Sequence, residues 1–145
     1  KNILNNPYIK DVNINKKWFK VYINIDEYKP VCIYNNKVLL ENNTLVDNIY
    51  NISGLPFVIN EINTLDVSSS FSKIDSDVLE KISQIEYFPN EVDKDRYLLY
   101  MVDGNSVYIT LSKITKVNKY NSIVSQMEGK NGIIYLDSGD YIELK

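Results

Sequence analysis

Turn-forming segments rich in Asn, Asp and Gly divide this chain into short apolar runs, and this pattern limits the folds open to it. Asn35-Asn36-Lys37 and Asp103-Gly104-Asn105-Ser106 each lie between two runs of β-branched and aromatic residues. Asn and Gly tolerate the positive φ angles of tight hairpin turns, and short runs of this kind favour strands. The sequence therefore predicts antiparallel hairpins.

The first part of the chain shows a clear alternation of apolar and polar residues. Val12 and Ile14 occupy every second position, and so do the apolar residues between Val21 and Ile25. A period of two predicts two half-buried strands, joined by a bend over Lys16–Lys20 that presents Trp18 and Phe19.

Two other segments have the spacing of three and four residues that is typical of a helix face. The first contains Ile74, Val78, Ile82 and Ile85, with Ser72 as the expected N-cap. The second covers Lys116–Glu128 and contains Val117, Tyr120, Val124 and Met127, with Gly129 beyond its end.

The order of the expected elements favours an α+β fold with mostly antiparallel sheets and two helices. A last hairpin is expected from Ile133–Leu136 and Tyr141–Leu144 around Asp137-Ser138-Gly139-Asp140. Gly54 and Pro56 break regular structure, so two modules are expected to meet within 52–60. Lys1–Asn6 is expected to be the end of a helix that starts upstream, which suggests a fragment.

Composition excludes several functional classes. The chain has 145 residues, a net charge of −3 and lysines dispersed among acids, so no basic stripe is present for a nucleic-acid backbone. No run of about 18 apolar residues is present to span a membrane. The single cysteine, Cys32, lies in an apolar run and is expected to fill a small space in the core.

The chain contains no histidine, so most hydrolase and zinc-site patterns are absent. Carboxylate pairs could still support glycoside hydrolysis. The candidates are Asp137 with Asp140, Asp93 with Asp95, and Glu27 with Glu41. Asp is common in turns because it bonds the nearby backbone. We therefore expect no enzymatic activity and no cofactor, and a surface hydrolase is retained only as an alternative.

The C-terminal hairpin is the candidate binding site. Tyr135 and Tyr141 flank its tip, and a terminal strand tends to lie at a sheet edge. Edge strands can pair with an incoming strand, and aromatic residues commonly anchor interfaces. The alternative is that the tyrosine rings simply pack over the sheet.

The chain resembles the FtsQ/DivIB family of bacterial cell-division proteins along nearly its whole length. In the first part, the resemblance rests on Pro7-Tyr8-Ile9-Lys10, Val12, Ile14, Lys16-Lys17, Glu27 and Pro30. In the second part, it rests on Ser53-Gly54-Leu55-Pro56, Asp103-Gly104, Lys119-Tyr120 and Asp137-Ser138-Gly139. Trp18-Phe19 departs from the family, which commonly has a proline at this bend.

The resemblance implies that residues 1–34 are the C-terminal part of a POTRA domain and that 35–145 form a β-domain, with the boundary within 31–56. Members of this family are non-enzymatic, single-pass membrane proteins whose N-terminal anchor would be absent here. This region would lie outside the cell membrane at the division septum. There it would bind DivIC/FtsB-type and FtsL-type coiled-coil membrane proteins and help to regulate septal peptidoglycan synthesis.

In this family, the DivIC/FtsB-type partner adds a strand to the last strand of the β-domain. The residues implicated by this resemblance are Tyr135, Leu136, Asp137, Ser138, Gly139, Asp140, Tyr141, Ile142, Glu143 and Leu144. Alternation places Tyr141 with Glu143 on one face and Ile142 with Leu144 on the other, and Ile142 is expected to face the core. The alternative function is a POTRA-type substrate-binding module of a secretion or outer-membrane assembly system.

Overall fold

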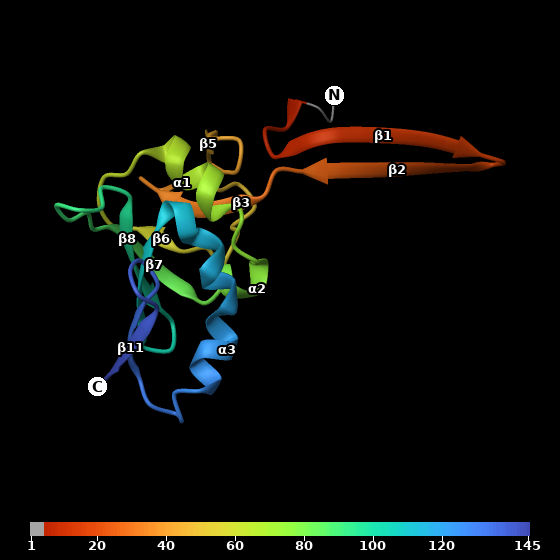
Figure 1. Cartoon of the computed structure of the whole chain (residues 1–145). Helices are drawn as coiled ribbons and strands as arrows, with labels where there is room; N and C mark the ends of the chain where they lie inside the picture. The colour runs from red at the N-terminus through yellow and green to blue at the C-terminus, as the bar shows by residue number, and fades with distance from the viewer. Residues whose placement is uncertain (1–4) are drawn as a thin grey trace.

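The protein consists of one large β-sheet with helices and a separate two-stranded hairpin that projects from it (Figure 1). The computed structural model describes residues 5–145. The nine-stranded sheet has the order β11-β10-β9-β8-β7-β6-β3-β4-β5, and β1 pairs with β2 alone. The helix end predicted over Lys1–Asn6 lies largely outside the described residues.

The strands are β1 (Ile9–Lys17), β2 (Lys20–Glu27), β3 (Pro30–Tyr34), β4 (Lys37–Leu40), β5 (Leu45–Val46), β6 (Phe57–Val58), β7 (Ile82–Tyr87), β8 (Arg96–Met101), β9 (Ser106–Thr110), β10 (Gly132–Tyr135) and β11 (Tyr141–Leu144). The helices are α1 (Thr64–Phe71), α2 (Ser76–Leu79), the 3₁₀ helix η2 (Leu111–Lys119) and α3 (Tyr120–Ser125). Within residues 5–145, none of the helices has both the length and the apolar character needed to cross a bilayer.

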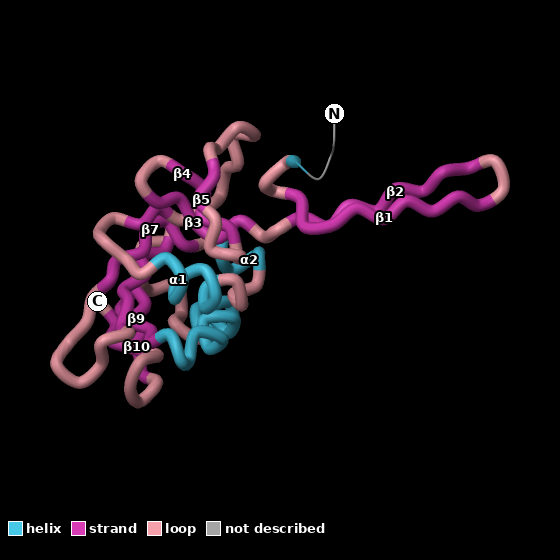
Figure 2. The backbone as a smooth tube through the Cα atoms, turned by 90° about the horizontal axis from the view of Figure 1, so that it is seen from above, coloured by secondary structure: helices cyan, strands magenta, loops and turns pink. Residues whose placement is uncertain are grey.

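The predicted α+β fold is confirmed. Most neighbouring strands are antiparallel, whereas the pairs β3–β6, β6–β7 and β9–β10 are parallel. The helices gather together on one face of the sheet (Figure 2). This arrangement buries an apolar layer between sheet and helices and leaves the other face of the sheet uncovered by helices.

The hairpin turns predicted from sequence are present. Asn35 and Asn36 have φ angles of 51° and 65°, and they join the paired residues Tyr34 and Lys37. Asparagine accepts this left-handed backbone more readily than most residues, as a two-residue hairpin turn requires. The turn between β1 and β2 is also two residues long, and it places Trp18 at φ 60°.

The helix predicted from Ile74 to Ile85 is wrong. Only the short α2 is helical there, Ser72 ends α1, and Ile82 and Ile85 both lie on β7. The register of β7 against β8 shifts between Ile82 and Gln84, so an extra residue is inserted at this point. A β-bulge of this kind lets two residues three apart face the same side, which imitates helical spacing.

The other helical segments were predicted in part. Residues 116–128 are helical from η2 through α3 to Ser125, and Gly129 follows with φ 75°. Helix α1 was not predicted, because a run of serines weakens its apolar pattern. The Asn63 side chain caps it by accepting a hydrogen bond from the Asp66 N–H at 3.1 Å.

The core has two parts that meet near β6. The larger part lies between sheet and helices, and it includes Cys32, as predicted for a core position. The smaller part lies around β3–β5 and contains Tyr8. Leu55, just before β6, packs against both parts.

The projecting hairpin is fixed to the sheet at its base. Tyr8 is buried in the smaller core, and its hydroxyl donates a hydrogen bond to the Asp47 carbonyl at 2.7 Å. The Lys29 N–H donates to the Glu41 carboxylate at 2.6 Å, and the Lys29 ammonium donates to the Ser72 carbonyl at 3.1 Å. Because β3 already belongs to the large sheet, the boundary between the projecting hairpin and the large sheet lies at Lys29–Pro30. The assignment of 1–34 to a POTRA domain stays a prediction.

A buried polar network ties the β8–β9 turn to the helices and to β10. The Asn105 amide donates to the Tyr120 hydroxyl at 3.0 Å and accepts from the Gly132 N–H at 2.9 Å. The Tyr120 hydroxyl in turn donates to the Asp103 carboxylate at 2.6 Å. Burial is the larger cause that raises the pKa of Tyr120, and the hydrogen bond to Asp103 raises it further. This hydroxyl therefore stays protonated and remains a hydrogen-bond donor at neutral pH.

We expect Asn105→Ala to lower the free energy of unfolding by about 1–3 kcal/mol, because it leaves the Gly132 N–H buried without a partner. Chemical denaturation measures this loss. Asn24→Ala is the control, since Asn24 is exposed on β2, and it should change stability by less than about 0.5 kcal/mol. Equal stability of the two variants would contradict the role of Asn105.

Candidate functional site

The last strand, β11, forms one edge of the large sheet (Figure 1). It pairs with β10 in antiparallel register, with Ile134 opposite Ile142 and Tyr135 opposite Tyr141. The Lys145 N–H donates to the Asn131 carbonyl at 3.0 Å, which fixes the phase of the ladder. Backbone groups alternate in direction along a strand. The N–H and C=O groups of Ile142 and Leu144 therefore point outward from the sheet.

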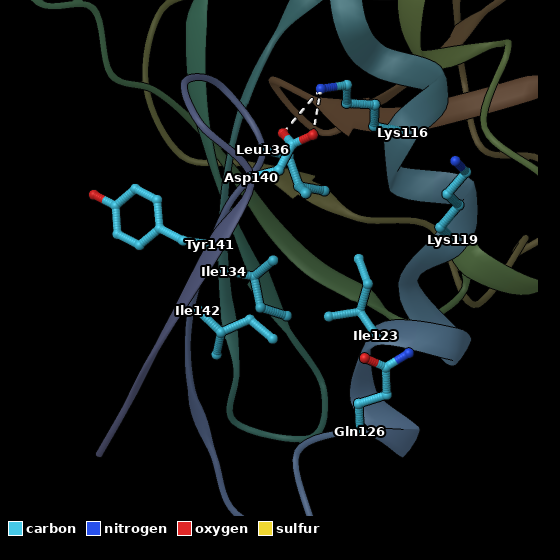
Figure 3. Close-up of a pocket in the computed structure, with 9 residues that line it drawn as sticks. All are labelled: Lys116, Lys119, Ile123, Gln126, Ile134, Leu136, Asp140, Tyr141 and Ile142. Atoms are coloured by element: carbon cyan, nitrogen blue, oxygen red, sulfur yellow. Dashed lines mark hydrogen bonds and ion pairs between the residues drawn. The ribbon is translucent and has the colours of Figure 1, made fainter.

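A groove runs between β11 and the helical segment η2–α3 (Figure 3). Its volume is about 260 Å³. Ile134 and Ile142 extend into it from the sheet, and Ile123 faces them from α3. The groove is therefore apolar at its floor and opens directly beside the free edge.

An ion pair closes one end of this groove. The Lys116 ammonium donates to both carboxylate oxygens of Asp140 at 2.8 Å (Figure 3). Asp140 has a φ of 46° in the tight turn before β11, which brings its carboxylate to the helix. Lys119 and Gln126 also line the groove from the helical side. These groups give an apolar groove a polar rim with cationic side chains.

On the opposite face of the sheet, aromatic rings form a row that ends at the edge strand. The Tyr108 and Tyr135 rings stack with centroids 5.2 Å apart, and the Tyr135 and Tyr141 rings stack at 4.4 Å. The Arg96 guanidinium carbon lies 3.9 Å from the Tyr108 centroid. Tyr141 points away from the groove in Figure 3. The rings thus stack over the sheet, which is the arrangement that the alternative interpretation expected, and Tyr141 remains half exposed at the end of the row.

Asp137 supports the site from within. Its carboxylate accepts a hydrogen bond from Arg96 Nε at 2.8 Å, and both side chains are largely buried. Its carbonyl accepts from the Lys113 ammonium at 3.2 Å. The other carboxylate oxygen, Oδ1, accepts no hydrogen bond from residues 5–145. Asp137 therefore holds the turn before β11 in place, and its side chain offers little surface to a partner.

The other residues predicted for binding fall in different environments. Leu136 is buried, whereas Ser138 and Gly139 are exposed in the turn. Ile142 lies on the helix-side face, as predicted, but 38% of its surface is exposed because the groove beside it is open. Leu144, on the same face, is also exposed.

Gly132 also supports the site and was not among the predicted residues. A Cβ atom at this position would lie 2.5 Å from the Glu143 carbonyl oxygen of β11. Such a contact is shorter than any packed Cβ tolerates, so glycine is required for β11 to approach β10. A glycine at the start of a predicted strand is a signal of close backbone approach.

Several of the carboxylates considered for catalysis have their own hydrogen-bond or ion-pair partners. Asp137 pairs with Arg96, and Asp140 pairs with Lys116. Asp93 accepts from the Thr110 hydroxyl at 3.1 Å and also from the Asp95 N–H. Among the described residues, no group of three or more acidic or cysteine side chains is arranged to hold a metal ion.

Comparisons with known proteins agree in pointing to one group. The chain is 31% identical over 143 residues to the cell division protein DivIB of Enterococcus faecalis, and 30% identical over 154 residues to that of Bacillus subtilis. These matches cover 92% and 99% of this chain. The chain spans only 38% and 59% of the length of these relatives. The match to the DivIB of Listeria monocytogenes is 29% identical over 95% of this chain and 56% of that protein.

A solved structure shows the same fold. The major extracytoplasmic domain of DivIB from Geobacillus stearothermophilus, in its trans isomer, superposes with a TM-score of 0.56 at 21% identity. The match covers 71% of this chain and 96% of the solved chain. No family model matches the chain.

We expect Gly132→Ala to detach β11, because the added methyl group collides with the Glu143 carbonyl. Overpacking of this kind costs about 1–3 kcal/mol. Hydrogen exchange should show loss of protection at the inward amides of Tyr141, Glu143 and Lys145.

Gly129→Ala is the matched control for this variant. Gly129 has nothing within 4 Å of an added Cβ, although its φ of 75° makes alanine unfavourable there. The control can lower overall stability while β11 stays protected. Protected β11 amides in Gly132→Ala would contradict the proposed collision.

We also expect Asp140 to titrate below its ordinary value. The hydrogen bond from Lys116 lowers the pKa of Asp140 from 3.8. Because the pKa of Asp140 is lower in the folded state than in the unfolded state, the ion pair stabilises the fold at pH values above the unfolded-state pKa. This stabilisation is lost as the pH falls through the folded-state pKa. NMR titration of the carboxyl carbon measures the midpoint. Lys116→Gln should raise it, and an unchanged midpoint would contradict the ion pair.

Proposed function

Because this chain belongs to the FtsQ/DivIB family of bacterial cell-division proteins, we propose that it is a non-enzymatic scaffold region that binds DivIC/FtsB-type and FtsL-type partners. Binding takes place outside the membrane, on a protein that is anchored by a segment not included in this chain. Through these partners, the protein helps to regulate septal peptidoglycan synthesis. The observation that carries this proposal is the unpaired edge of β11 beside an open groove.

The edge supports binding by strand addition. Ile142 and Leu144 direct their N–H and C=O groups away from β10, so an extended segment can pair with them without displacing any bond of the fold. Glycine at 132 and the ion pair at Asp140 hold this strand in position. A partner strand would thus meet a preorganised edge, which lowers the entropic cost of pairing.

The groove supports specificity and affinity. Each backbone hydrogen bond adds only about 1 kcal/mol to binding, so the few bonds available at this edge are not sufficient alone. Side chains of an added strand alternate between the two faces. On one face, they would pack into the groove against Ile123 and Ile142. On the other face, they would meet the exposed ring of Tyr141.

Ile142→Pro tests the edge directly. Proline removes the outward N–H at this position and leaves the inward bonds of Tyr141 and Glu143 in place. We expect the affinity for the extracellular part of a DivIC-type protein from the same organism to fall at least about tenfold, the equivalent of about 1.4 kcal/mol. Isothermal titration calorimetry measures this change.

Two further variants act as controls. Ile142→Val keeps the N–H and most of the apolar side chain, so it should bind nearly as well as the wild type. Tyr141→Pro removes an inward amide and should lower the free energy of unfolding as well as binding. Undiminished binding by a folded Ile142→Pro variant would contradict docking at this edge, and absence of binding by the wild type would contradict the proposed partner.

A further inference from the structure

We propose that the tip of the β1–β2 hairpin contacts an anionic lipid bilayer, with Trp18 and Phe19 inserted among the lipid headgroups. This surface is separate from the β11 edge and lies at the far end of the hairpin (Figure 1). The proposal rests on the exposure of the tip, its charge and its shape. It is independent of any partner that β11 binds.

The two aromatic residues are fully presented to solvent. They form the turn itself, beyond the last paired residues Lys17 and Lys20. Trp18 is 90% exposed, and Phe19 is completely exposed. Exposed side chains of this size are unusual at the end of a protruding turn, because each leaves a large apolar area in water. Insertion of both side chains into an apolar phase would remove this apolar area from water.

Positive charge is concentrated around this turn. Residues 12–25 contain Lys16, Lys17 and Lys20 and no Asp or Glu. The acidic residues of the hairpin, Asp11, Asp26 and Glu27, lie at its base, and the whole chain has a net charge of −3. The positive tip thus stands out against an acidic protein, and this complements an anionic surface.

The two strands that lead to the tip form an amphipathic hairpin, with one apolar face and one polar face. The cross-strand pairs Val12–Ile25 and Ile14–Ile23 lie on one face, whereas Asn13–Asn24 and Asn15–Tyr22 lie on the other. Trp18 and Phe19 follow the last cross-strand pair, Lys17–Lys20, so they lie beyond the end of the apolar face and not within it.

The chemistry favours a bilayer over other anionic partners. Indole rings prefer the interface between headgroups and hydrocarbon, and lysines beside them bind anionic headgroups. A soluble polyanion can pair with the lysines but offers no apolar phase to Trp18 and Phe19. The tip is convex, which suits a deformable surface.

Trp18 is the single tryptophan of the chain and provides a built-in probe. The chain is titrated with vesicles of phosphatidylcholine containing phosphatidylglycerol, with pure phosphatidylcholine vesicles, and with inorganic polyphosphate. We expect the tryptophan emission to shift to shorter wavelength only with the anionic vesicles. High salt should weaken the binding. Each lysine near the surface strengthens partitioning roughly fivefold, so the triple change of Lys16, Lys17 and Lys20 to Gln should reduce it about a hundredfold.

Vesicle co-sedimentation tests the aromatic residues. The double variant Trp18→Ser with Phe19→Ser should no longer sediment with the anionic vesicles. Val92→Ser is the control, since Val92 is a similarly exposed apolar residue that lies far along the chain from the tip, and it should sediment like the wild type.

Several results would overturn the proposal. No blue shift with anionic vesicles would assign the tip to another occupant, such as an apolar groove on a protein. Equal binding to neutral vesicles would remove the role of the lysines. Binding to polyphosphate without insertion into vesicles would make the tip a simple anion site.

Discussion

The two-residue strand β6 joins the two halves of the large sheet, and the rest of the structure depends on it. Phe57 pairs with Ile33 of β3 on one side and with Gln84 of β7 on the other. Further bonds run from the Ile33 N–H to the Pro56 carbonyl at 2.9 Å and from the Ile59 N–H to the Ile85 carbonyl at 3.0 Å. Without this short strand, β3–β5 and β7–β11 would be two separate small sheets.

The parallel pairing of β9 with β10 explains why a groove lies beside the free edge. Parallel neighbours need a crossover connection, and here it is the helical segment η2–α3. This segment covers the sheet only as far as Ile134, and β11 extends the sheet by one more strand beyond it. Ile142 is therefore left half covered, and the same topology that closes the core leaves an open groove beside the edge strand.

Local signals in the sequence were sufficient for the hairpins but not for the contacts between distant segments. The Asn35-Asn36 and Asp103-Gly104 turns were predicted because their backbone angles depend on adjacent residues alone. The bulge at Ile82–Gln84 gives a strand the spacing of a helix, so this segment was wrongly predicted as helical. The position of β11 at the edge was expected from its place in the chain. The Arg96–Asp137 pair joins residues 41 positions apart and could not be read from spacing.

The length of the projecting hairpin also sets the distance between its tip and the large sheet. Its first strand has nine residues, so at about 3.3 Å per residue the turn lies about 30 Å from the base. Only Tyr28 and Lys29 separate β2 from the first strand of the large sheet. Adding one residue to each strand would move the apolar side chains beyond the insertion to the opposite face of the hairpin. The length of the hairpin can therefore change without this reversal only in steps of two residues per strand, or about 7 Å. The standoff between the tip and the sheet is thus set in discrete increments.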